Sequence, residues 1–194
     1  SDFLIIQYEF TADNNVLTKL KSNINELSKM TENNKLMKAK TLGFFAQYTS
    51  AQKMDQKTEA NFKKTIEEIK SLNKNEEKLY IIESNLQSDV NEKIKILNNG
   101  LKKADTNIFI KLYLAMNYFN SGSFKKAVDL FDETFINLPD NIKNLYANTR
   151  NFAFYFIKNP LKNREIISKI SLKILNYVDL IDIIKSETNM LQVL

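Results

Sequence analysis

Carboxylates that lie next to each other are the first residues in this chain that could do chemistry. Glu67 and Glu68 form one such pair, and Asp132 and Glu133 form another. Adjacent residues on a helix point in different directions, so neither pair can hold one proton or one metal ion between two carboxylates. We expect both pairs to be surface charges.

The remaining candidates for catalysis or metal binding are few. Asp179 and Asp182 lie one helical turn apart, but nothing beside them supplies the further oxygen ligands that Ca²⁺ or Mg²⁺ requires. The chain has no histidine and no cysteine, which removes the commonest catalytic base, the thiolate nucleophile and the usual zinc ligands. Gly122 has no glycine companion at the spacing of a phosphate-binding loop. We predict a protein that is not an enzyme and uses neither a metal nor a cofactor.

The composition points to helices as the elements that position these side chains. Of 194 residues, 43% are hydrophobic and 26% are charged, which is normal for a folded domain. Only 3 glycines and 2 prolines are present, too few for the many turns of a sandwich or a barrel. We therefore expect an all-α fold in a single domain over residues 1–194.

The positive charge of the chain is spread along its length. The net charge is +5 and the pI is about 9.1, but almost all basic residues are lysine, and Arg150 and Arg164 are the two arginines. Arginine reads bases and phosphates better than lysine does, and the lysines are not clustered. We predict no nucleic-acid partner.

Apolar residues recur at spacings of three and four in several segments, as in amphipathic helices. The pattern predicts helices over about 16–27, 36–48, 62–72, 79–86, 90–101 and 140–157. A break is expected from Thr31 to Asn34, and a polar connection from Thr49 to Thr58. The apolar run 3–6 is too short to decide between a helix and an edge element.

Residues 108–141 predict two helices joined by a turn at Gly122 and ended by Pro139. Small residues would let the two helices approach closely, and aromatic residues would fill the space between them. The positions that carry this pattern are Leu114, Ala115, Tyr118, Gly122, Phe124, Ala127, Phe131 and Pro139. In type and spacing they resemble one unit of the tetratricopeptide repeat (TPR) family. The unit departs from the family pattern at Lys111, where a tryptophan is usual, and at Thr134, where a small residue is usual.

The resemblance implies a fold in which antiparallel helical hairpins stack as a short, right-handed solenoid of about three units. Gly43 follows Leu42 as in the first helix of such a repeat, but the other segments lack the expected small residues. Degenerate repeats and plain helical hairpins are both compatible with them.

The resemblance also implies a function, the binding and stabilising of a partner protein, as an adaptor or scaffold does. In this family the first helix of each unit lines the concave surface, and the following helix 140–157 carries aromatic residues on more than one side. The expected partner-binding residues are Phe109, Leu112, Met116, Phe119, Asn120, Phe154 and Tyr155. Since the surface is apolar, we expect it to take an apolar helix or extended segment, and we expect Phe119→Lys to abolish capture without changing the fold. The alternative is that the N-terminal helices or the helix with Phe152 and Phe156 fill the groove from within.

The region 161–194 is very apolar and repeats like a coiled-coil seam. It would either cap the helical stack or make a homodimer, so a self-associating structural protein is one alternative function. A carrier of a small apolar ligand is another.

The location of the protein is predicted from composition and from the N-terminus. Abundant lysine, asparagine and isoleucine are typical of an AT-rich bacterial genome, and no apolar run is long enough to span a membrane. Since the chain starts at Ser1, a signal or a lipid-anchor segment could have been removed from a precursor. We expect the bacterial periplasm or cell envelope, with the cytoplasm as the alternative.

Overall fold

The computed structural model describes residues 1–50, 54–104 and 107–158. All regular elements within these ranges are α-helices, which confirms the expected all-α class. They are α1 (Asp2–Thr11), α2 (Asn14–Met30), α3 (Lys35–Ser50), α4 (Gln56–Leu72), α5 (Lys78–Asn85), α6 (Val90–Leu101), α7 (Ile108–Asn120), α8 (Phe124–Phe135) and α9 (Asp140–Lys158). The predicted cap or dimer helix 161–194 lies outside the described residues, as do Asp179, Asp182 and Arg164.

The periodic segments of the sequence are the helices of the structure, with small shifts at their ends. The run 3–6 belongs to a helix, α1. The break from Thr31 to Asn34 separates α2 from α3 as expected. The polar connection predicted from Thr49 to Thr58 is wrong at both ends, because α3 continues through Ser50 and α4 already begins at Gln56. Among the described helices, none combines the length and the apolar character that crossing a membrane requires.

Side-chain caps fix where several of these helices begin. The carboxylates of Asp13, Asp55 and Asp89 accept hydrogen bonds from backbone N–H groups in the first turns of α2, α4 and α6. Asn107 does the same for α7, where its side-chain oxygen accepts from Phe109 N and Ile110 N at 3.0 and 2.9 Å. These bonds satisfy donors that have no partner inside the helix, so each helix has a defined start.

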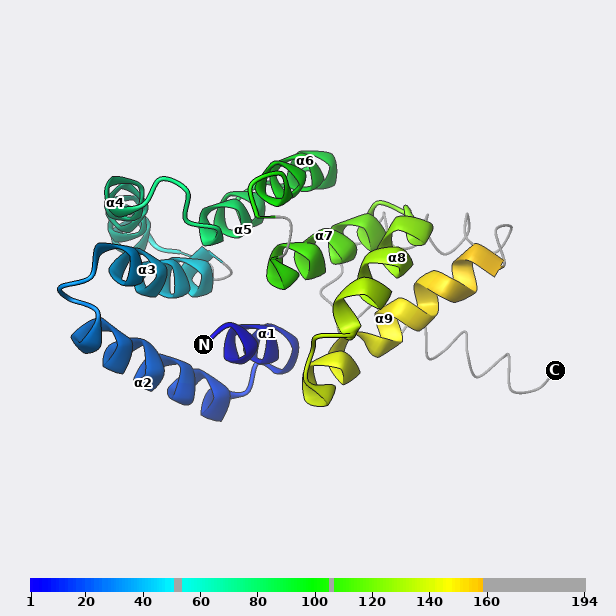
Figure 1. Cartoon of the computed structure of the whole chain (residues 1–194), viewed down its shortest axis with the longest axis horizontal. Coiled ribbons are helices and arrows are strands. Elements are labelled where there is room, and N and C mark those ends of the chain that lie inside the picture. Colours follow the sequence, from blue (N-terminus) through cyan, green and yellow to red (C-terminus); the bar gives the residue numbers. More distant parts are fainter. Residues whose placement is uncertain (51–53, 105–106, 159–194) are drawn as a thin grey trace.

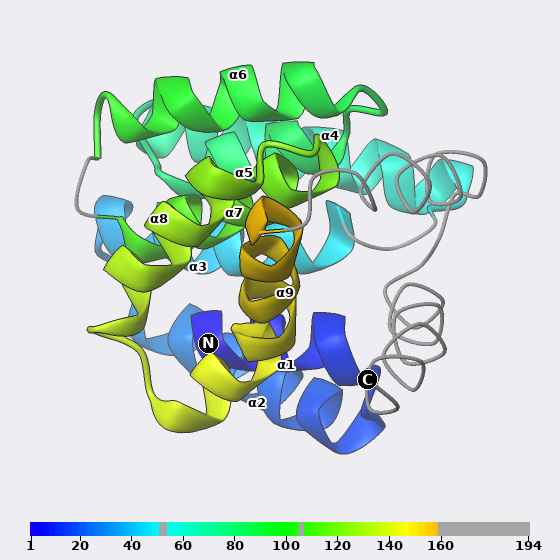
Figure 2. The same cartoon turned by 90° about the vertical axis from the view of Figure 1, so that its right-hand side faces the viewer.

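Consecutive helices pack side by side along the chain. The helices α3 and α4, α5 and α6, and α7 and α8 pair as hairpins, and α9 packs on α8. Together they form an arc that runs from α3 through α5 and α7 to α9, with α2 beside α3 (Figures 1 and 2). Helix α1 lies inside this arc and contacts both α3 and α9, so the N-terminal helix meets elements from both ends of the described chain.

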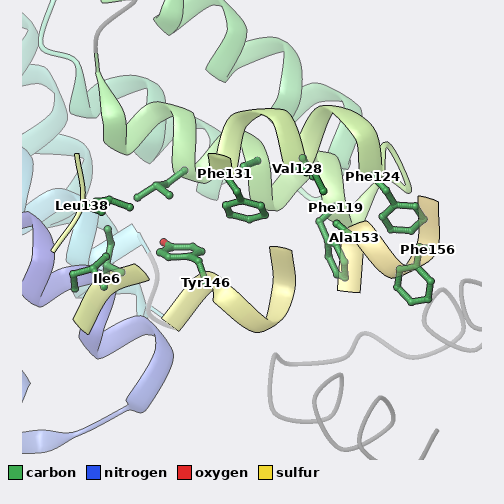
Figure 3. Packing of buried hydrophobic residues seen from close by; sticks show 13 residues of the cluster. Ile6, Phe119, Phe124, Val128, Phe131, Leu138, Tyr146, Ala153 and Phe156 are labelled. Carbon is green, nitrogen blue, oxygen red and sulfur yellow. The ribbon is translucent and has the colours of Figure 1, made fainter. Parts of the chain in front are cut away.

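The largest hydrophobic cluster joins α7, α8 and α9 to α1, and we call it the α7–α9 core. Phe131 lies at its centre with no exposed surface, between α8 and the Tyr146 ring of α9 (Figure 3). Phe119, Phe124 and Phe156 form an aromatic group toward the end of α9. Ile6 brings α1 into the same cluster.

The hairpin of α7 and α8 has the two helices and the turn that the sequence predicts within residues 108–141, but α8 ends at Phe135, four residues before Pro139. Ala115 and Ala127 have no exposed surface, which allows close contact between the two helices. Gly122 forms the turn with a φ of 76°, in the left-handed region that glycine adopts without strain.

We expect Gly122→Val to lower the free energy of unfolding by about 1–2 kcal/mol, because a β-branched residue is strained in the left-handed conformation. Gly122→Asn is the matched control, since asparagine tolerates this conformation, and it should lose less. Urea denaturation followed by circular dichroism measures both. Equal losses in the two variants would show that φ at this position does not set the cost.

Candidate partner-binding face

The inner side of the helical arc is where the structure brings distant parts of the chain together. Helix α1 lies on it, and the described residues that contact α1 there by an aromatic pair or a polar bond come from four helices. They are Tyr48 of α3, Lys78 of α5, Phe109 and Tyr113 of α7, and Tyr146 of α9, and we call them the α1-binding face.

Three aromatic pairs hold α1 on this face. The ring centroids of Phe3 and Phe109 lie 5.5 Å apart, those of Tyr8 and Tyr48 5.8 Å apart, and those of Phe10 and Tyr146 4.7 Å apart. Each distance is within the range of favourable aromatic contacts. Since Phe3, Tyr8 and Phe10 contact three different helices, α1 bridges α7, α3 and α9.

Ile5 and Ile6 add an apolar centre to the same helix. Both are 1% exposed, and they enter two different clusters. Ile5 packs with Leu20, Ile24 and Phe44 of α2 and α3, while Ile6 belongs to the α7–α9 core. Burying each of these side chains is worth about 2 kcal/mol before the entropy lost on ordering. Helix α1 therefore contributes to both halves of the described chain.

A polar group lies among these apolar contacts. The Tyr113 hydroxyl donates to the two carboxylate oxygens of Glu9 at 2.7 and 2.6 Å and accepts from Gln47 Nε2 at 2.9 Å. Burial raises the pKa of Tyr113 well above its usual range, and the nearby Glu9 carboxylate adds to the rise. The tyrosine is therefore a neutral donor that ties α1 to α7 and α3.

Glu9 is a carboxylate without a cationic partner in the described part of the chain. Glu9 is exposed at the surface, but neighbouring protein atoms crowd its carboxylate and partly bury it. This burial raises the pKa of Glu9 to about 7, although the hydrogen bond from Tyr113 lowers it. Since some solvent still reaches the group, its effect on stability is smaller than that of a fully buried carboxyl.

The docking of α1 should consequently weaken as the pH rises. The pKa of Glu9 in the folded chain, about 7, lies above its ordinary value of 4.5, so the folded state binds the proton more tightly than the unfolded state. The stabilisation is complete below pH 4.5 and is lost as the pH rises through 7. Hydrogen exchange of the α1 amides, expressed as a free energy of opening, should show a decrease between pH 5 and pH 8. Glu9→Gln should remove the decrease, and a decrease that persists in Glu9→Gln would assign it to another group.

The structure places two of the seven predicted partner-binding residues inside the protein. Leu112 has no exposed surface and Phe119 is 4% exposed, both within the α7–α9 core. The expectation that Phe119→Lys leaves the fold intact is therefore wrong, because it would place an ammonium group among the rings of Phe124 and Phe156. In this conformation these two residues are covered by the chain's own helices, which is the alternative that the sequence left open.

The other predicted residues on α7 are more accessible. Phe109 and Met116 are half-buried, and Asn120 is exposed at the end of the helix. Of these three, Phe109 is on the α1-binding face, where its ring meets Phe3.

The two predicted residues on α9 lie apart from the α1-binding face. Phe154 is 44% exposed, with the cationic groups of Arg150 and Lys158 each 5.4 Å from its ring. Tyr155 is half-buried, and its ring meets Phe156 at 5.9 Å. The structure therefore does not gather all seven residues into one surface.

Sequence reasoning missed Lys78, Tyr113 and Gln47. The contact between Tyr113 and Glu9 joins residues 104 positions apart, and no local pattern indicates such a pair. A weak signal existed for Lys78, since it directly precedes the apolar residues Leu79, Ile81 and Ile82 in the sequence.

The neighbouring carboxylates behave as surface charges, as the sequence predicted. Glu68 pairs with Lys38 of α3 at 2.8 Å, whereas Glu67 points to Lys70 at 3.6 Å. The second pair, Asp132 and Glu133, also makes its contacts with two different residues.

Asp132 accepts two hydrogen bonds from Arg150 of α9, and Glu133 pairs with Lys111 of α7. Within the described ranges, no group of three or more acidic side chains is arranged to hold a metal ion.

A separate apolar hollow of about 370 Å³ lies beside α4. Its apolar lining comes from Met54, Phe62, Ile66 and Leu86, and charged residues of α4 surround its rim. The volume is near the lower end of the range for small-molecule sites.

Comparisons of the chain with protein-family models, with curated proteins and with solved structures found no match. The similarity to the tetratricopeptide repeat family therefore remains a prediction from the residues of α7 and α8.

Proposed function

We propose that this protein is a helix-binding interaction module and not an enzyme. Its partner site is the α1-binding face, and α1 occupies that face when no partner is present. The observation that carries the proposal is the docking of α1 itself, an apolar helix held across α3, α5, α7 and α9 by side chains of all four. A surface that accommodates one apolar helix has the shape and chemistry to accommodate another.

Several features of α1 support its being replaceable. It has 10 residues, fewer than a helix needs to be stable alone, and no side chain caps its first turn. Ala12, which ends it, adopts a left-handed conformation with a φ of 50°, which costs about 1–2 kcal/mol for a residue with a Cβ.

The polar groups around the Tyr113 hydroxyl, which are Glu9 of α1 and Gln47 of α3, are also incompletely paired. Glu9 has no cation within the described ranges, and the buried side-chain oxygen of Gln47 has no hydrogen-bond donor there. A buried acceptor without a donor costs about 1–3 kcal/mol. A partner helix that supplied a donor at this point would bind better than α1 does.

The binding mechanism is the burial of apolar side chains against Phe109, Tyr146 and the α7–α9 core. At about 25 cal/mol per Å², one large aromatic side chain contributes a few kcal/mol before ordering costs. Leu112 and Phe119, which the sequence predicted to bind a partner, would not touch it. They would support this face from within the α7–α9 core.

The architecture that we propose for this function is a short, right-handed stack of three TPR-type hairpins, made by α3 to α8. The pairing of successive helices and the small residues of the α7–α8 contact support it. On the basis of composition we further propose a bacterial protein, and we keep the cell envelope as its proposed location. Self-association through residues 161–194 is the alternative role.

The test opens the face without changing its residues. Gln7→Pro removes a backbone N–H and introduces a ring that cannot fit in the middle of α1, so this helix should not form. Gln7 is half-buried, and Gln7→Ala is the matched control because it keeps α1 helical. The probe is a fluorescein-labelled peptide with the sequence of residues 1–12, followed by fluorescence anisotropy.

We expect the peptide to bind Gln7→Pro at least about 10-fold more tightly than Gln7→Ala, because tethered α1 competes at an effective concentration on the order of millimolar. A peptide of scrambled order should bind neither variant. If Gln7→Pro keeps the circular dichroism of the other helices and takes up no peptide, the proposal is wrong. Should this variant unfold, competition of excess peptide with α1 in the unchanged protein, followed by hydrogen exchange, tests the same point.

The hollow beside α4 supports a second candidate function, the carriage of a small apolar ligand. The probe is 1-anilinonaphthalene-8-sulfonate, whose fluorescence rises in apolar sites. We expect a rise that Ile66→Asp removes and that the exposed control Ile136→Asp keeps. The same fluorescence in all three proteins would reject this hollow as a ligand site.

A further inference from the structure

Lys78 is a cation enclosed within the apolar surroundings of α1. It begins α5 and is 5% exposed. Its ammonium lies 4.1 Å from the centre of the Phe44 ring and 5.8 Å from that of Phe109, both within the range of cation–π attraction. It donates to the carboxylate of Asp2, the first residue of α1.

The neighbouring helix α3 is shaped for this lysine. A Cβ atom at Gly43 would lie 2.9 Å from Cδ and 3.2 Å from Cβ of Lys78. Because such distances are too short for carbon atoms, any larger residue at position 43 would displace the lysine side chain. Gly43 therefore leaves the space through which Lys78 reaches Asp2.

The lysine needs an acidic partner at this point. Burial lowers the pKa of Lys78, while Asp2 and, less strongly, Glu76 favour its charged form. Glu76 is itself 7% exposed, and burial raises its pKa. A carboxylate brought in by the bound helix thus supplies most of the compensation for a buried positive charge.

The direction of α1 sets where that carboxylate must be. Phe3 meets Phe109 near the start of α7, and Glu9 meets Tyr113 one turn later, so α1 runs in the same direction as α7. Asp2 lies in the first turn of the bound helix, where its negative charge is also stabilised by the positive end of the helix dipole.

We propose that the partner of this face is an apolar helix with a carboxylate in its first turn, which takes the place of Asp2 on Lys78. The helix has large apolar residues one, four and eight positions after the carboxylate, as Phe3, Ile6 and Phe10 follow Asp2. This inference rests on the proposed function and adds the chemistry that selects the partner.

A double-mutant cycle in the Gln7→Pro chain tests the inference. Two peptides are compared, one with residues 1–12 and one in which the residue matching Asp2 is asparagine. Each is measured by anisotropy against Gln7→Pro and against Gln7→Pro with Lys78→Met, which keeps the volume of the side chain without its charge. The cycle cancels the effect of the carboxylate on the helicity of the peptide itself.

We expect the aspartate peptide to bind the chain with Lys78 at least about 10-fold more tightly than the asparagine peptide. Against Lys78→Met the two peptides should bind equally within about 2-fold. A preference for aspartate of the same size in both proteins would overturn the inference, since it would come from the peptide helix alone. Equal binding of both peptides to the chain with Lys78 would overturn it as well.

Either of these two contrary results would leave the helix-binding function in place, because the peptides would still bind. If neither peptide binds a folded Gln7→Pro chain, both the proposed function and the inference are wrong. If Lys78→Met proves unfolded by circular dichroism, Lys78→Gln serves in the same cycle, with the same expected outcomes.

Discussion

Phe131→Ala is expected to lower the free energy of unfolding by about 3–5 kcal/mol, the usual cost of removing a buried aromatic ring. Phe131 has no exposed surface, and its ring lies 5.8 Å from those of Phe135 and Tyr146. It connects α8 to α9 at the centre of the α7–α9 core (Figure 3). Urea denaturation followed by circular dichroism gives the free energy.

Phe45→Ala is the matched control, because Phe45 is 45% exposed on α3. It should cost no more than about 1 kcal/mol. Similar losses in the two variants would show that the α7–α9 core is not the main source of stability in the described chain.

The helices could be predicted from the sequence because each has a period that a single segment reveals. Val16, Leu20 and Ile24 recur on one side of α2, and all three are buried. The turn at Gly122 was predictable for a similar reason, since a left-handed residue between two apolar segments is a local requirement. Local patterns of this kind do not depend on the rest of the fold.

The partner-binding residues could not be predicted as well, because the covering of an apolar side chain depends on distant elements. Met116 and Phe119 are both apolar and lie on the same helix, but Phe119 is buried among rings of α8 and α9 while Met116 is only half-buried. The sequence shows that α7 is apolar on several sides. It does not show which of those sides α1, α8 and α9 will cover.

Gly43 illustrates how a local sequence pattern can conceal a requirement that comes from a distant part of the chain. Its place after Leu42 resembles the first helix of a repeat, but in the structure the absent side chain makes room for Lys78. That requirement arises from α5, 35 positions further along the chain, and from the charge that α1 brings to the lysine. The contact is visible only when the three helices are assembled.

The N-terminal helix changes what the described chain can offer a partner. Without α1, Phe109 would lose its contact with Phe3 and Lys78 would lose its carboxylate partner Asp2, which favours occupation of the face by another apolar helix with an acidic residue. With α1 in place, the same surface belongs to the core. The binding face and the stability of the protein are therefore linked, and a substitution that weakens α1 should both lower stability and raise the affinity for a helical peptide.

The ion pair of Asp2 and Lys78 gives the second large expected effect. Asp2→Asn keeps the shape of the side chain but leaves Lys78 buried, with Glu76 as the remaining carboxylate that favours its charged form. We expect a loss of about 3 kcal/mol in the free energy of unfolding, at the lower end of the range for buried pairs, because 18% of the Asp2 side chain is exposed. Asp140→Asn, which breaks an exposed pair with Lys143, is the control and should cost less than about 0.5 kcal/mol.

The loss should depend on pH in a defined direction. Burial holds the pKa of Lys78 below its ordinary value of 10.5, so the folded state releases the proton more readily than the unfolded state does. Stability that depends on this group is present above pH 10.5 and is lost as the pH falls through the folded pKa. Removing Asp2 lowers that pKa further, so the difference between Asp2→Asn and the unchanged protein should shrink as the pH rises toward 10.5. The Ser1 amine, whose pKa burial lowers from 8.0, also interacts with Asp2, so its titration is complete before the upper part of this range is reached. Urea titrations at several pH values measure the difference, and a gap that stays constant would show that the charge of Lys78 is not its cause.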